Sequence, residues 1–237
     1  MSSDTLVLHS SNRSWATREY ACFQGTFKLD ADSGLYFDSS TPEVHKARIR
    51  ATFACMPSQL KLIAQRMQLT VSTTAGRTRA NHLYCTIYGN WSNYRPSPHL
   101  EISLGSLSTE LFYGHLVHEL SHLWWFAGTE QMRRQFEHEL IESQSESMVE
   151  ITDYVHAKYL DWRHAVKTNQ PGGCEKPYLR LWVLESFAES SAACAVDGYQ
   201  SAECNVDIEL RRSMIQRVAE LNVETISKED LAAVPGL

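Results

Sequence analysis

Several features are missing from this chain of 237 residues, and each absence excludes a class of protein. The six cysteines include no C-x-x-C pair, which argues against a zinc ribbon or zinc finger. No apolar run is long enough to span a bilayer, and the first residues lack the basic region and apolar segment of a secretory signal. We therefore expect no membrane association and a cytoplasmic or nuclear location.

An excess of positive charge is also absent. Lysine and arginine number 22 against 28 aspartates and glutamates, which gives a net charge of −6. Such a chain has no broad electrostatic affinity for nucleic acid. Hydrophobic residues make up 43% and charged residues 21% of the sequence, as in ordinary globular proteins. The chain is long enough for one substantial core, or for one domain with an appended helical part.

The most informative pattern that is present is H-E-x-x-H, formed by His118, Glu119 and His122 inside the apolar run 116–126. Histidines four residues apart lie on one face of a helix and can bind one metal ion. A glutamate beside the first histidine can reach water on that metal and take its proton. We predict that His118 and His122 bind Zn²⁺ and that Glu119 is the general base. A buried helix with two hydrogen-bonded histidines is the alternative.

The flanking residues favour a helix at this position. Ser108 or Thr109 can cap its start, and Glu110 lies in the first turn, where a negative charge is stabilising. Gly128 is suited to end the helix. Upstream, residues 99–104 alternate between apolar and polar side chains, as a half-buried strand does. The sequence therefore predicts a strand, a short connection and then the H-E-x-x-H helix.

Strands are expected only in the first half of the chain, and helices dominate the second, which indicates an α+β fold. We divide the chain into an irregular segment 1–40 with a short hairpin near 23–37, a core 41–168 and a helical part 174–237 packed on the core. Gly and Pro mark a linker at 169–173. The expected helices are 42–54, 57–69, one or two within 130–165, 178–195 and 206–221; the other expected strands are 69–74 and 82–88, with a loop at 89–98.

Three stretches occur in a suggestive order: Ser72-Thr-Thr-Ala-Gly-Arg77, Leu100-Glu-Ile-Ser103 and the H-E-x-x-H segment. Together they resemble the SprT-like zinc metallopeptidases over residues 57–140. The resemblance implies a zincin-like fold, in which a small mixed sheet accompanies the H-E-x-x-H helix, with one zinc ion and proteolysis of protein substrates. In some members those substrates are bound to DNA, so DNA association is implied as well. The third zinc ligand of the family is a histidine after the helix, which here implies His138.

Other residues compete for the place of the third zinc ligand. Glu142, followed one turn later by Glu146, resembles the glutamate ligand of another H-E-x-x-H group, the gluzincins. Glu185 or Glu189, farther along the chain, resembles a gluzincin glutamate helix too. His138 and Glu142 are four residues apart and share a helical face, so one could bind the metal while the other orients it. Spacing alone does not choose among these candidates.

The sequence thus predicts a zinc-dependent metalloendopeptidase that hydrolyses peptide bonds in protein or peptide substrates. Zinc lowers the pKa of its bound water towards about 7, and Glu119 moves the proton to the leaving amine. Tyr154 or Tyr178 could donate a hydrogen bond to the tetrahedral intermediate. Two alternatives stay open: a gluzincin-like peptidase in which Glu142 is the third ligand, and a non-catalytic binding protein with a zincin fold.

Overall fold

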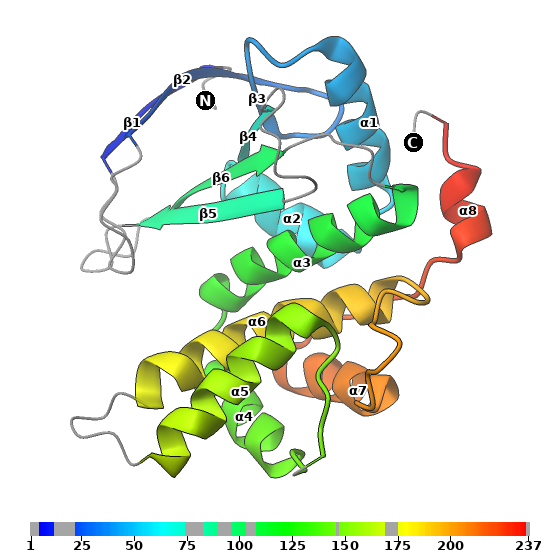
Figure 1. The fold of residues 1–237 in the computed structure, drawn as a ribbon. Coiled ribbons are helices and arrows are strands. Elements are labelled where there is room, and N and C mark those ends of the chain that lie inside the picture. Colours follow the sequence, from blue (N-terminus) through cyan, green and yellow to red (C-terminus); the bar gives the residue numbers. More distant parts are fainter. Residues whose placement is uncertain are drawn as a thin grey trace. The chain divides into compact units, whose positions relative to one another are not determined.

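The computed structural model describes residues 5–11, 22–73, 83–89, 96–102, 108–145, 147–168 and 175–235 (Figure 1). Their architecture is mixed, with strands in the first half of the chain and helices in most of the second, as an α+β fold requires. The chain forms two compact units, one of residues 1–108 with 234–237 and one of residues 109–233. The H-E-x-x-H helix belongs to the second unit, whereas the sequence groups it with the strands in 41–168.

The first unit contains a six-stranded mixed sheet. In spatial order its strands are β1 (Thr5–Ser11), β2 (Cys22–Leu29), β3 (Tyr36–Asp38), β4 (Thr70–Thr73), β6 (Pro96–Ile102) and β5 (Leu83–Gly89). The pairs β3–β4 and β4–β6 are parallel, and the other pairs are antiparallel.

Two expectations for this unit are corrected. The expected hairpin near residues 23–37 exists as β2–β3, but the described parts of 1–40 are not irregular, because strands form at 5–11, 22–29 and 36–38. Strand β6 begins inside the stretch 89–98 that was expected to be a loop, since prolines are tolerated at the start of a strand. The arginine-containing turn at 74–77, which contributes to the SprT-like resemblance, lies outside the described residues.

Helices α1 (Glu43–Ala54) and α2 (Ser58–Arg66) confirm the two helices expected between residues 42 and 69. Their buried residues include Phe53 and Leu60, which belong to the apolar core. Strand β6 carries a buried histidine, His99, that faces two hydroxyls of β4. Oγ1 of Thr70 lies 2.9 Å from Nδ1 of His99, and Oγ of Ser72 lies 3.0 Å from Nε2. Burial lowers the pKa of His99 to about 4.

The second unit is helical. It consists of α3 (Thr109–Ala127), α4 (Glu130–Glu142), α5 (Asp153–Lys167), α6 (Glu175–Ala195), α7 (Ile208–Ala219) and α8 (Lys228–Ala232). The segment 130–165 is two helices, because α4 ends at Glu142 and Thr152 caps a new start by accepting a hydrogen bond from Val155 N. In the described parts of the chain, no helix combines the length and the apolar character needed to cross a membrane.

Aromatic side chains join the helices of this unit. Trp125 of α3, Phe136 of α4 and Phe187 of α6 form a cluster with ring centroids 5.1–5.8 Å apart. Helix α6 packs against α3, α5 and α7. A buried ion pair joins α7 to the segment before α5, with Arg211 Nη2 3.2 Å from Glu150 Oε1. These contacts hold the faces of α3 and α6 against each other.

Candidate metal centre

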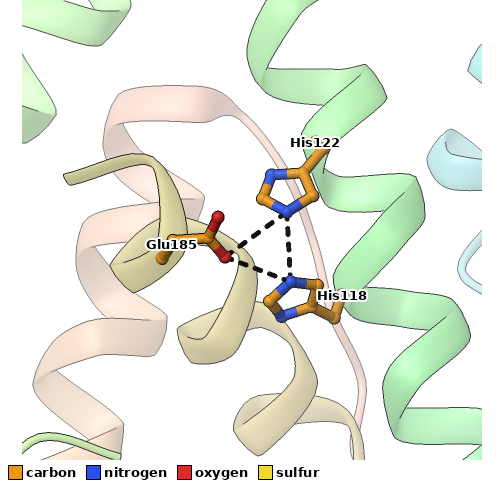
Figure 2. Close-up of side chains that lie close together, drawn as sticks. All are labelled: His118, His122 and Glu185. Carbon is orange, nitrogen blue, oxygen red and sulfur yellow. Dashed lines mark hydrogen bonds and ion pairs between the residues drawn. The ribbon is translucent and has the colours of Figure 1, made fainter. Parts of the chain in front are cut away.

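Three potential metal ligands meet between α3 and α6. Nε2 of His118 and Nε2 of His122 lie 3.0 Å apart. Oε2 of Glu185 lies 3.4 Å from the first nitrogen and 3.6 Å from the second. Figure 2 shows the two imidazoles reaching from α3 and the carboxylate from α6, all pointing towards one another. The residues are only 9%, 8% and 8% exposed, respectively. Among the described residues, only these three form a group of His, Cys, Asp or Glu side chains whose ligand atoms all lie within 4.8 Å of one another.

The separations of these atoms fit a single metal ion. The circle through the three atoms has a radius of about 1.9 Å, slightly less than the Zn–N and Zn–O bonds of about 2.0–2.2 Å. Ligands at that bond length and at tetrahedral angles are about 3.4 Å apart. The three atoms are therefore spaced so that His118, His122 and Glu185 could bind one metal ion together. Two imidazoles and one carboxylate are also a donor set that zinc accepts.

Small buried residues adjoin the site on both helices. Ser121 of α3 precedes His122, and its hydroxyl donates to the Val117 carbonyl at 2.7 Å, so it can be buried without another partner. On α6, Ser186, Ala188 and Ser190 adjoin Glu185 and Glu189 in the sequence and are also buried. The Ser186 hydroxyl donates to Oε1 of Glu150 at 3.4 Å.

The two histidines differ in their affinity for a proton. Burial, together with the neighbouring His118, lowers the pKa of His122 to about 4. Burial also opposes protonation of His118, but the carboxylates of Glu185 and Glu189 raise its pKa well above 6.5. The pKa of Glu185 is lowered despite its burial, because the two histidines stabilise the carboxylate. Without a metal the cluster therefore holds a proton that metal binding would release.

Further polar side chains surround the three ligands. Glu119 is buried and close enough to act electrostatically on His118 and on two tyrosines, Tyr154 and Tyr199. Tyr154, in the first turn of α5, lies close enough to Glu185 to feel its charge and is 50% exposed. Partial burial and the charge of Glu185 raise the pKa of Tyr154, so its phenol keeps its proton.

The expected third ligand, His138, is not at this site. His138 and Glu142 lie on the exposed side of α4, with side chains that are 70% and 67% exposed, and they pair with each other at 3.3 Å. The buried face of α4 carries Met132, Phe136 and Leu140 instead. The structure therefore leaves His138 and the alternative Glu142 away from His118 and His122, and it brings the distant candidate Glu185 beside them. Glu146 lies outside the described residues.

The sequence indicated some of the other residues at the site. Glu185 and Glu189 are acids in a run of buried small and apolar residues, and acids in such a run need a partner. Of the two tyrosines considered, Tyr154 is at the site, whereas Tyr178 is an exposed residue in the first turn of α6. Tyr199 was not foreseen; it lies in a loop with no local pattern that would indicate a role.

Comparisons with models of known protein families, with curated proteins and with solved structures found no match to this chain. The chemistry of the site is therefore inferred from its own residues.

Proposed function

We propose that this protein is a zinc-dependent peptidase that hydrolyses peptide bonds in protein substrates. The observation that carries the proposal is the meeting of His118, His122 and Glu185, whose ligand atoms lie 3.0–3.6 Å apart. Three protein ligands with one open position are typical of catalytic zinc, whereas structural zinc has four protein ligands. The H-E-x-x-H helix and this ligand count support the same chemistry.

Zinc held at this site would act as a Lewis acid, lowering the pKa of water and polarising the carbonyl group of the scissile bond. Glu119 follows His118 directly on α3, and its buried carboxylate can accept a proton from the attacking water. The same carboxylate can then deliver that proton to the leaving amine. Glu185 and the two histidines bind the metal and take no part in the proton transfer.

Tyr154 is suited to stabilise the negative charge that develops on the carbonyl oxygen. Its phenol is protonated, lies close to Glu185 and is half exposed, so a substrate can reach it. A donor placed where charge appears in the transition state lowers the barrier more than a donor in water can. Removing one such donor typically costs about 10²–10³-fold in kcat.

The ligand set favours one family type over the other. Two histidines of H-E-x-x-H with a glutamate from a later helix is the gluzincin arrangement, here with Glu185 in place of Glu142. The SprT-like resemblance implies a histidine ligand, and His138 is on an exposed face. DNA association rests on that resemblance alone, so it is not part of the proposal.

The proposal is tested with casein as substrate and with zinc measured in the same samples. Wild type should bind about one zinc per chain and hydrolyse casein, lose activity with a chelator and regain it when zinc is added. Glu119→Gln should keep the zinc and lose about 10²–10⁴-fold in rate, because the amide cannot accept the proton. A folded wild type that binds no zinc, or a Glu119→Gln variant as active as wild type, would contradict the proposal. Zinc binding without any hydrolysis would favour the non-catalytic alternative.

A second pair of variants tests the role of Tyr154. Tyr154→Phe should lower kcat by about 10²-fold or more and leave zinc content unchanged. Tyr178→Phe, which removes a hydroxyl from an exposed tyrosine of α6, is the matched control and should behave like wild type. Equal kcat values for both variants would remove Tyr154 from the mechanism while leaving the zinc site in place.

A further inference from the structure

The two histidines differ in what lies beside the nitrogen that faces away from the metal position. Nδ1 of His118 lies 3.5 Å from Oε2 of Glu189, and neither of these buried atoms has a hydrogen-bond partner among the described residues. Nδ1 of His122 is also buried without such a partner, and the carboxylate beside His122 lies at its Nε2 instead. A neutral histidine that offers Nε2 to a metal must carry its proton on Nδ1. A carboxylate beside that nitrogen selects this tautomer and fixes the ring.

Glu189 is itself held by contacts with two further side chains. It follows Glu185 by one turn of α6, so both carboxylates lie on the face towards α3. The hydroxyl of Thr152, just before α5, donates to Oε1 of Glu189 at 3.1 Å. The phenol of Tyr199 lies close enough to Glu189 to help lower the pKa of that carboxyl, while burial and the charge of Glu189 raise the pKa of the phenol. A buried carboxylate with these partners keeps a defined orientation, because turning away would leave its charge unpaired.

The lack of a side chain at Gly114 leaves room for the ring of Tyr199. The ring of Tyr199 packs on α3 one turn before His118, where a Cβ on Gly114 would lie 2.5 Å from two ring carbons. Real Cβ atoms do not approach so closely, so a larger residue at this position would displace the ring. The same ring meets His115 edge-on, with centroids 6.0 Å apart. The tyrosine is therefore fitted to the helix that carries both histidines.

We propose that Glu189 and Tyr199 are positioning residues that hold His118 in the tautomer and orientation that a metal ion requires, with Gly114 admitting the tyrosine ring. The inference rests on the proposed function, because it assumes that the cluster binds zinc. It goes beyond the three ligands by naming the residues that set their affinity. Partners of this kind contribute about 10–100-fold to metal affinity in proteins.

The test measures zinc affinity by competition with a chromophoric chelator, using the full chain and ZnCl₂ alone. Tyr199→Phe keeps the ring against Gly114 and removes only the hydroxyl, and Glu189→Gln keeps the shape of the side chain. Both variants should bind zinc about 10–100-fold more weakly than wild type. Tyr178→Phe is the matched control and should bind zinc as wild type does. Thermal unfolding of the metal-free proteins separates a positioning role from a purely structural one. A positioning role predicts that zinc binds more weakly while the stability of the metal-free protein stays close to that of wild type.

Each result has a defined meaning. Weaker zinc binding by both variants, with metal-free unfolding close to wild type, would support the proposal. Equal zinc affinity in wild type, Tyr199→Phe and Glu189→Gln would overturn it while leaving the zinc site and the peptidase proposal intact. If folded wild type bound no zinc, the proposed function would fail first, and the inference with it. Gly114→Ala gives an independent check, because displacing the ring should weaken zinc binding in the same direction.

Discussion

Helices α4 and α6 carry similar chemistry at the same spacing and end in opposite environments. On α4, His138 and Glu142 are four residues apart, and they form an exposed pair. On α6, Glu185 and Glu189 are also four residues apart, but both are buried against α3 and contact the histidines of H-E-x-x-H. Each helix thus carries two potential metal-binding residues four positions apart, and the distribution of apolar residues on each helix decides which pair is buried.

The composition of each helix explains the difference. Helix α4 has a narrow apolar stripe of Met132, Phe136 and Leu140, and its charged residues lie outside that stripe. Helix α6 is buried at nearly every position from Trp182 to Ala195, so its acids have no exposed side to occupy. An acid on a helix with one apolar stripe can be solvated, whereas an acid on a buried helix must find protons, donors or a metal.

The largest expected effect is loss of zinc on substitution of a glutamate of α6, compared with no loss on substitution of a glutamate of α4. Glu185→Ala removes a ligand, so zinc affinity should fall by more than the about 100-fold expected for an outer partner, and hydrolysis should cease. Glu142→Ala should leave both unchanged, because that side chain is exposed on α4. Zinc per chain and chelator competition on the two variants check this. Loss of zinc in Glu142→Ala alone would reverse the comparison.

The next largest effect is a loss of stability when the apolar contact of α4 with α3 and α6 is removed. Phe136 packs against Trp125 and Phe187 with ring centroids 5.8 and 5.2 Å away. Phe136→Ala should lower the free energy of unfolding by about 3–5 kcal/mol, since it leaves a cavity in this cluster. Denaturant unfolding followed by tryptophan fluorescence measures the change. A loss below about 1 kcal/mol would mean that α4 is not part of the core of the second unit.

A third prediction contrasts the ligand histidines with a structural one. His99 has a hydroxyl beside each ring nitrogen, and burial lowers its pKa to about 4. The folded first unit therefore binds fewer protons than the unfolded chain between pH 6.5 and 4, so its stability should fall as the pH falls through this range. The expected loss is roughly 3 kcal/mol. Hydrogen exchange of the β4 and β6 amides against pH measures it, and His99→Gln should flatten the profile; an unchanged slope in that variant would exclude His99 as the cause.

The smallest effect is expected at the exposed pair on α4. His138→Ala should change the free energy of unfolding by less than about 0.5 kcal/mol, because exposed ion pairs four residues apart on a helix contribute little. Zinc content should be that of wild type. Calorimetric unfolding with zinc analysis checks both quantities, and a loss of zinc would restore His138 as a ligand.

Much of the local structure could be predicted because it depends on near neighbours. Gly128 follows the end of α3 at Ala127, as expected, and α1 and α2 lie within the two helical stretches expected between residues 42 and 69. The strands of residues 5–38 were missed, since a short strand is stabilised by partners elsewhere in the sheet rather than by its own sequence. His118, Glu119 and His122 were found because their spacing is a property of one helix.

The sequence by itself determined the H-E-x-x-H helix, its boundaries and the set of residues from which a third ligand could come. It could not choose among them, because His138, Glu142, Glu185 and Glu189 all lie on helices at suitable spacing. Only the tertiary structure decided which of them lie beside His118 and His122, by burying α6 against α3 and leaving the polar face of α4 in solvent. The physical reason is that metal ligands must lie within a few ångströms of one another. When they are far apart in the chain, the packing of the helices sets that distance.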